Sequence, residues 1–125
     1  MPRAGPTSFL NIDLDIRHPS RLDDLISHLE PTFLVLNRDG NDASLELAED
    51  RETLEATALG IVKCVQKLPP EAKGIWAGCD FRRINVGIQA GGHPHATCFS
   101  ISQETVQLLA GLHCEVVFTV YAAIA

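Results

Sequence analysis

The chain has 125 residues, of which 46% are hydrophobic and 21% are charged, and this composition is typical of one globular domain and excludes a disordered chain. Its formal net charge is −6 and its densest basic cluster is only Arg82-Arg83, so we expect no nucleic acid partner. No apolar stretch reaches the length of a membrane span, and the N-terminus lacks the apolar run of a signal peptide. We therefore expect a cytoplasmic protein without membrane contact.

The sequence is interpreted as two parts, a disordered tail over residues 1–8 and a single α+β domain over residues 9–125. The tail contains Pro2, Gly5 and Pro6 and ends where an alternating pattern begins. No repeat or linker divides the remaining chain, so one core is expected.

The first half of the domain predicts a strand, a helix, a hairpin and a long helix. Residues 9–17 alternate between apolar and polar side chains, which is typical of a half-buried strand. A helix follows up to Pro31, with Ser20 as its cap and Asp23 three residues on. Residues 33–36 and 43–47 predict a hairpin with a loop of four or five residues. Residues 51–68 then predict the longest helix, beginning after Asp50 and ending before two prolines.

The second half predicts three strands and one more helix. Residues 71–78 fit either one irregular helical turn or a loop. Residues 81–90 and 97–101 predict strands that are separated by a turn at residues 91–94. Ser102 is expected to cap a helix of about ten residues, and residues 115–122 predict the last strand because they are rich in Val, Phe, Thr and Tyr.

The predicted order is β-α-β-β-α-β-β-α-β. It favours a two-layer α+β sandwich of ferredoxin-like type, with a mostly antiparallel sheet and the helices on one face. The other face would be polar, and it would be exposed to solvent or bind a partner. The candidate binding residues on it are Asn11, Asp13, Asp15, Asn85 and Gln89.

The C-terminal half carries a family resemblance. The segments that carry it are Phe99–Ser102, then Val106, Leu108-Leu109 and Leu112, and finally Val116–Tyr121. They resemble the end of the domain of unknown function family 4279, in which a strand ending in Ser caps a short Leu-rich helix and a closing strand ends in an aromatic residue. Gly91-Gly92 lies where family members carry a Gly-rich turn, whereas the hairpin over residues 33–47 lacks their usual insertion. The resemblance implies a fold more than an activity; some small bacterial domains of this kind resemble immunity proteins, which bind and neutralise a toxin.

One grouping of side chains could bind a metal ion. His93, His95 and Cys98 lie close in sequence, and His113-Cys114 could join them. Imidazole and thiolate are zinc ligands, and three ligands with an open position form a catalytic geometry. No standard zinc spacing is matched, so the two histidines are better read as exposed turn residues; no cofactor is expected, and zinc is kept as the alternative.

Other reactive groups have simpler interpretations. Cys64, Cys79, Cys98 and Cys114 form no C-x-x-C pair and are expected to be buried, inert thiols. Asp13 and Asp15 share a strand face, where two carboxylates could perform acid–base chemistry or bind a hard cation, or could simply be solvated. Trp76 is either a core residue or a surface anchor for a partner.

Three functions follow from these observations. The first is a non-enzymatic protein-binding domain, which could be of the toxin-neutralising type; no motif of a common catalytic or nucleotide-binding site occurs. The second is a small metal-dependent protein or enzyme built on His93, His95 and Cys98. The third is a homodimeric or small-molecule-binding domain, because both faces of residues 33–36 are apolar.

Overall fold

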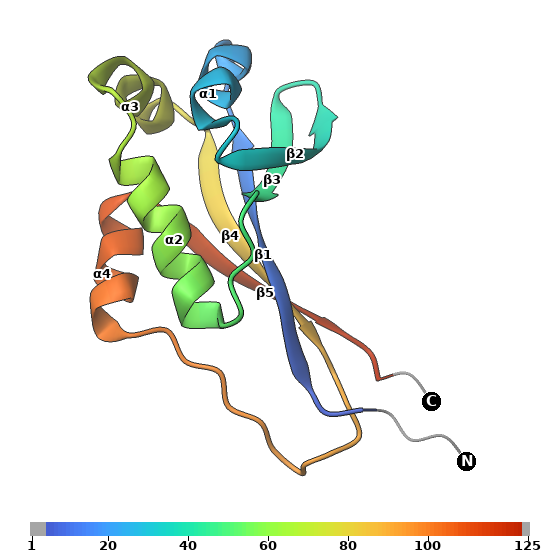
Figure 1. Cartoon of the computed structure of the whole chain (residues 1–125). Helices are drawn as coiled ribbons and strands as arrows, with labels where there is room; N and C mark the ends of the chain where they lie inside the picture. Colours follow the sequence, from blue (N-terminus) through green and yellow to red (C-terminus); the bar gives the residue numbers. More distant parts are fainter. Residues whose placement is uncertain (1–4, 124–125) are drawn as a thin grey trace.

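The computed structural model describes residues 5–123 and confirms the α+β class (Figure 1). In chain order the elements are β1 (Ser8–Arg17), α1 (Leu22–Leu29), β2 (Phe33–Asp39), β3 (Asp42–Leu47), α2 (Leu54–Gln66), α3 (Pro70–Ala77), β4 (Phe81–Gln89), α4 (Gln103–Gly111) and β5 (Glu115–Tyr121). None of these helices is long and apolar enough to cross a membrane.

The five strands form one sheet in the order β2-β3-β1-β4-β5. β1 lies between β3 and β4 and is antiparallel to both, while β2 is antiparallel to β3. β5 is the exception, because it pairs with β4 in parallel. The helices lie on one side of the sheet, and the core fills the space between the two layers (Figure 1).

The alternation along β1 places Ile12, Leu14 and Ile16 in this core, as predicted. Leu10 departs from the pattern and is half exposed. The pairing of β1 with β4 shifts register between Phe9 and Asn11, and such a bulge inserts one residue and turns the following side chains to the other face. Phe9 consequently packs against the core in place of Leu10.

The prediction of a strand over residues 97–101 is wrong. This segment is extended, but it does not pair with the sheet. Its alternating residues Phe99 and Ile101 are partly buried against the core, so packing alone produces the strand-like pattern. The chain needs this connection because β5 is parallel to β4 and must start at the same end of the sheet as β4.

Of the two readings of residues 71–78, the helical one is correct: α3 is a regular helix of eight residues. Pro70 occupies its first turn, where a missing N–H costs nothing. Ala72, Ile75 and Trp76 are buried at helical spacing. Gly74 hides this pattern in the sequence because glycine is a poor helix former.

Two predicted helix starts are wrong. The side chain of Ser20 does not cap α1; instead Nδ1 of the buried His18 accepts hydrogen bonds from the backbone N–H groups of Ser20 (3.1 Å) and Arg21 (2.8 Å). α2 begins after Thr53, whose Oγ1 accepts from the N–H of Ala56 at 3.1 Å, and not after Asp50. Histidine is not among the residues that mark a helix start in a sequence, so these hydrogen bonds of His18 could not be predicted.

The β2–β3 hairpin is tighter than predicted. Its strands continue to Asp39 and Asp42, and the loop is only Gly40-Asn41. Gly40 has a φ of 60°, a conformation that glycine adopts without a steric cost.

The start of the described chain contacts the turn after β4. The N–H of Gly91 donates to Oγ1 of Thr7 at 3.0 Å, and the N–H of Gly92 donates to the carbonyl of Gly5 at 2.8 Å. A Cβ atom on Gly91 would overlap this backbone, which explains why the position is glycine. Of the expected tail over residues 1–8, residues 1–4 lie outside the described residues and Ser8 begins β1.

α4 is held against α2 by one carboxylate. Glu55, in the first turn of α2, accepts hydrogen bonds from the backbone N–H of Ser102 (2.6 Å) and from Oγ1 of the buried Thr105 (2.7 Å). Ser102 also caps α4 as predicted, because its Oγ accepts from the N–H of Thr105. These hydrogen bonds lower the pKa of Glu55. A negative charge at a helix N-terminus is favourable, so the contact both caps and places α4.

We predict that Glu55→Ala lowers the free energy of unfolding by about 1 kcal/mol at pH 7, a modest value because the carboxylate is also open to solvent. Because the folded-state pKa is lowered, this stabilisation is present above the ordinary value of 4.5 and is lost as the pH falls through the folded-state value. Urea unfolding at neutral and acidic pH measures it. The exposed Glu52→Ala is the matched control; an equal loss at both pH values would contradict the role of the charge.

Candidate functional site

The most unusual surface of the molecule is the side of β5 that faces the helix layer. Val116, Phe118 and Val120 lie in register with Ile84, Val86 and Ile88 of β4, which are buried in the core. The three β5 side chains are nevertheless 40%, 53% and 61% exposed. We call these three residues the β5 stripe. It is a core-type surface without a cover.

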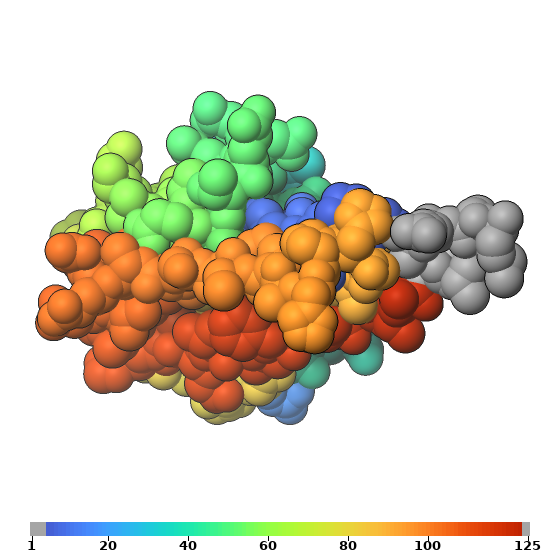
Figure 2. Space-filling view, turned by 90° about the horizontal axis from the view of Figure 1, so that it is seen from below, coloured from blue at the N-terminus to red at the C-terminus, as the bar shows by residue number. Residues whose placement is uncertain are grey.

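The position of α4 explains this exposure. The helix that connects two parallel strands commonly covers the sheet beside them. Here the bonds of Glu55 place α4 on α2 instead, and β5 is left at the margin of the helix layer. Figure 2 shows β5 (red) as a strip of surface beside the segment that leads from β4 to α4 (orange).

The free edge of β5 offers backbone groups next to the same side chains. The carbonyl of Tyr121 accepts from the N–H of Ala90, so the backbone groups of Tyr121 point toward β4. Since these groups alternate in direction along a strand, those of Val116, Phe118 and Val120 point toward the open edge. Val116, Phe118 and Val120 therefore each combine an exposed apolar side chain with backbone groups that point toward the open edge.

The opposite edge of the sheet, β2, is better protected. Leu34, Val35 and Leu36 are exposed there, but the pairing with β3 is interrupted by a register shift at Leu36. Arg38 continues the strand and forms an ion pair with Asp23 at 2.6 Å. Bulges and charged side chains are the usual means of blocking an edge strand. β5 has an uninterrupted register with β4, and its one charged side chain is Glu115 at its start.

The polar face predicted from the sequence exists on the other side of the sheet. Asn11 donates from Nδ2 to Asp13 (3.1 Å) and to Glu46 (3.2 Å), and Oγ of Ser44 donates to Asp15 at 2.8 Å. Glu46 was missed in the sequence because only strand pairing places it beside Asp13. Burial, followed by the charges of Asp15 and Glu46, raises the pKa of Asp13.

The rest of this face is structural. Asn85 accepts a hydrogen bond from Oγ1 of Thr119 at 2.7 Å, and Gln89 donates to the carbonyl of Ala122 at 2.8 Å, so both tie β4 to β5. The guanidinium of Arg83 lies 4.1 Å from the centre of the Phe81 ring. These residues reinforce the sheet, and the carboxylates of Asp13 and Asp15 beside them are partly buried.

We predict that Asp13→Asn raises the free energy of unfolding by about 0.5 kcal/mol at pH 7 because it removes a crowded negative charge. The raised folded-state pKa means that the ionised form is destabilising above that value, and that the effect is absent below the ordinary value of 3.8. The gain should disappear on acidification in thermal or urea unfolding. Asp50→Asn, at an exposed site, is the control; a loss of stability in the Asp13 variant would contradict the assignment.

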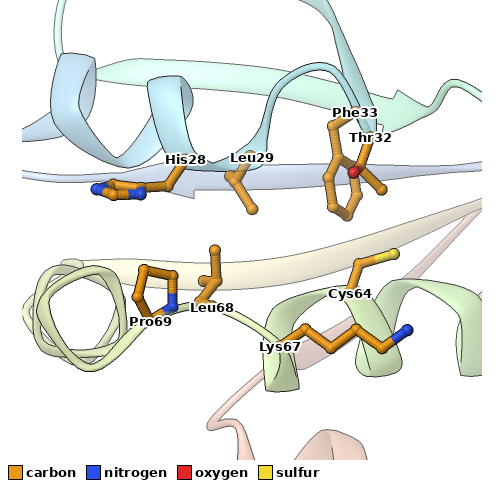
Figure 3. A pocket seen from close by; sticks show the side chains of 8 residues that line it. All are labelled: His28, Leu29, Thr32, Phe33, Cys64, Lys67, Leu68 and Pro69. Atoms are coloured by element: carbon orange, nitrogen blue, oxygen red, sulfur yellow. The ribbon is translucent and has the colours of Figure 1, made fainter.

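A pocket of about 260 Å³ opens between the end of α1 and the end of α2 (Figure 3). Leu29 and Leu68 face each other across it, with Lys67 and His28 at its borders. Its lining residues are His28, Leu29, Thr32, Phe33, Cys64, Lys67, Leu68 and Pro69. It is smaller than most ligand pockets, and its two basic residues lie near helix C-termini, where cations are favourable without a ligand.

The proposed metal ligands do not come together. His93, His95 and Cys98 are exposed in the connection between β4 and α4, and His113 ends α4 in a left-handed conformation with a φ of 58°. Among residues 5–123 no group of three or more His, Cys, Asp or Glu side chains is arranged to hold a metal ion. The Asp13 and Asp15 carboxylates are included in that statement.

Trp76 is a core residue, since it is only 5% exposed and its Nε1–H donates to the carbonyl of Leu112 at 3.1 Å. Of its two predicted roles, the position of Trp76 therefore fits the core residue.

The cysteines differ in environment. Burial raises the pKa of Cys79 and of Cys114 to about 11 in spite of the nearby Arg82, and it also raises the pKa of Cys64. These three thiols are protonated at neutral pH, as expected for inert cysteines. The predicted burial is confirmed for Cys79, whereas Cys64 and Cys114 are only partly buried and Cys98 is exposed.

We predict that Cys98 reacts first with a thiol reagent at pH 8. Accessibility favours it, whereas Cys79 and Cys114 are shielded and remain protonated until the pH approaches 11. Stopped-flow labelling of the native protein with Ellman's reagent should show one fast thiol, and Cys98→Ser should remove that phase. A fast phase that survives in Cys98→Ser and is lost in Cys114→Ser would contradict this order.

Comparisons of the chain with protein-family models, with curated proteins and with solved structures give no match. The resemblance to the domain of unknown function family 4279, and the toxin-neutralising role that it implies, therefore stay predictions.

Proposed function

We propose that the chain is a non-enzymatic protein-binding domain that uses the β5 stripe and the free edge of β5 as its contact surface. The observation that carries the proposal is the exposure of Val116, Phe118 and Val120 on the core-type side of an edge strand. Burying such side chains is favourable by about 25 cal/mol for each Å² removed from water. Soluble proteins usually protect edges of this kind, so an unprotected one marks a binding surface.

The chemistry of the surface supports strand addition as the binding mode. In that mode an extended segment of the partner pairs with the edge, its backbone supplies affinity and its alternate side chains supply specificity. The free N–H and C=O groups of Val116, Phe118 and Val120 provide the backbone partners. A partner strand with apolar side chains at alternate positions would extend the sheet and cover the β5 stripe.

The acidic side of the sheet is expected to have only a weak effect on which partner binds. Asp13, Asp15 and Glu46 lie on β1 and β3, two to three strands from the edge of β5. At a strand spacing of about 4.8 Å this is about 10–15 Å, roughly one Debye length or more at physiological salt. These charges disfavour acidic partners weakly and leave the apolar contact to determine affinity.

We predict that Phe118→Ser/Val120→Ser weakens binding to a purified protein partner at least about tenfold, because central apolar contacts dominate interface energy. The partner is first retained from an extract of the source cells on the immobilised wild-type chain, then identified, purified and measured by calorimetry. Leu34→Ser/Leu36→Ser, on the other edge, is the matched control with similar exposure and should bind normally. Equal binding by both double variants would contradict the proposal, as would a wild-type chain that binds neither another protein nor itself.

A further inference from the structure

The sequence of β5 is self-complementary about its central residue. Phe118 has a valine two residues before it, Val116, and another two residues after it, Val120. If a second copy of β5 runs antiparallel with Phe118 opposite Phe118, then Val116 of each copy lies opposite Val120 of the other. Two-fold interfaces require this property, since the same patch must fit itself when reversed. Val117 would then face Thr119, and Glu115 would face Tyr121.

The backbone favours the same register. The N–H and C=O groups of residues 116, 118 and 120 point toward the open edge, as inferred from the bond between Ala90 and Tyr121. In an antiparallel pair centred on Phe118, each of these residues exchanges both of its hydrogen bonds with the residue opposite. If the register shifted by one residue, backbone groups that point toward the open edge would lie opposite groups that point toward β4. The hydrogen bonds between the two copies would then be lost.

We infer that the partner of the β5 edge is a second copy of this chain, paired antiparallel with Phe118 on the two-fold axis, so that two five-stranded sheets become one. This inference rests on the proposed function and names its partner. It requires no rearrangement of α4, which already lies on α2 and leaves the β5 stripe open.

Charge does not oppose this pairing. Glu115 is the one charged side chain of β5, and the two copies of it would lie at opposite ends of the pair, about 20 Å apart at the usual rise per residue. The carboxylates of Asp13, Asp15 and Glu46 lie farther still from their equivalents. The net charge of −6 on each copy opposes association only through screened repulsion, so added salt should strengthen the dimer.

The area indicates a weak dimer. Phe118 and Tyr121 are each 53% exposed, and aromatic side chains of about 150–250 Å² would contribute roughly 200 Å² per copy. The valines and the free backbone add about as much, so the pair buries roughly 800 Å² in total, below the 1,200–2,000 Å² of stable complexes. We therefore expect a dissociation constant of roughly 10–500 µM.

Sedimentation equilibrium of the full chain over a wide concentration range measures whether the chain dimerises.

The same measurement on variants with introduced charges tests the register of the two strands. In the inferred register, a lysine introduced at position 116 faces a glutamate introduced at position 120 of the other copy. Val116→Lys and Val120→Glu should each weaken the dimer about tenfold, and the double variant should return to within about threefold of wild type. Parallel pairing would place two lysines together and give no rescue. Leu34→Lys on β2 is the control and should leave the dimer unchanged.

Amide hydrogen exchange of the wild-type chain gives a second readout that needs no substitution. The amides of Val116, Phe118 and Val120 should exchange slowly only at concentrations above the dissociation constant. Those of Val117 and Thr119 point toward β4 and should be slow at every concentration. Slow exchange at 116, 118 and 120 in the dilute protein would overturn the inference, because the edge would then already be covered.

The outcomes separate the two proposals. A dimer with rescue by the double variant supports both. A chain that stays monomeric at about 0.5 mM, yet binds another purified protein through the β5 stripe, overturns self-pairing and leaves the proposed function standing. A dimer that Leu34→Lys disrupts and Val116→Lys does not overturns both.

Discussion

Along its length α4 is held by the buried Leu109, and at its start it is held by the carboxylate of Glu55. By accepting hydrogen bonds from the backbone of Ser102 and the side chain of Thr105, it fixes the N-terminus of α4 against the first turn of α2. The connection between β4 and β5 then has to cross from the sheet to α2 and back. α4 is consequently part of the helix layer without being a cover for β5. The docking of α4 on α2 thus determines which part of the sheet is exposed.

The two edges of the sheet illustrate different solutions to the same problem. β2 carries apolar side chains but interrupts its ladder at Leu36 and continues into Arg38, which is paired with Asp23. β5 carries a regular ladder and one terminal charge. Monomeric proteins avoid a regular apolar edge strand because other chains can pair with it and aggregate. Its presence at β5, but not at β2, therefore supports β5 as the binding surface.

Local patterns predicted much of the fold. Alternation identified β1 and β4, helical spacing with Ser102 as a cap identified α4, and two prolines ended α2. The errors arose where tertiary packing imitates or overrides a local pattern. Phe99 and Ile101 alternate because the segment that carries them packs on the core, and the turn before α1 depends on His18, whose ring accepts hydrogen bonds from Ser20 and Arg21 only in its folded position.

The candidate site was predictable only in part. The polar face of the sheet followed from the patterns of β1 and β4, although Glu46 needed the pairing of β1 with β3. The strand predicted over residues 115–122 gave no indication that Val116, Phe118 and Val120 are exposed, because their exposure depends on where α4 docks. His93, His95 and Cys98 lie close in sequence but do not form a metal site, since the segment that carries them bends at residues 94 and 95 and leaves all three side chains exposed.

The parallel pairing of β5 also has a kinetic consequence. The β2–β3 hairpin closes over a two-residue loop, whereas β4 reaches β1 across residues 18–80 and β5 reaches β4 across residues 90–114. Closing a longer loop costs more entropy before any contact rewards it, so β4 and β5 are expected to join the sheet after the hairpin has formed. Once joined, β5 has one neighbouring strand and little cover, so its local opening is expected to require less free energy than that of the central strands β1, β3 and β4.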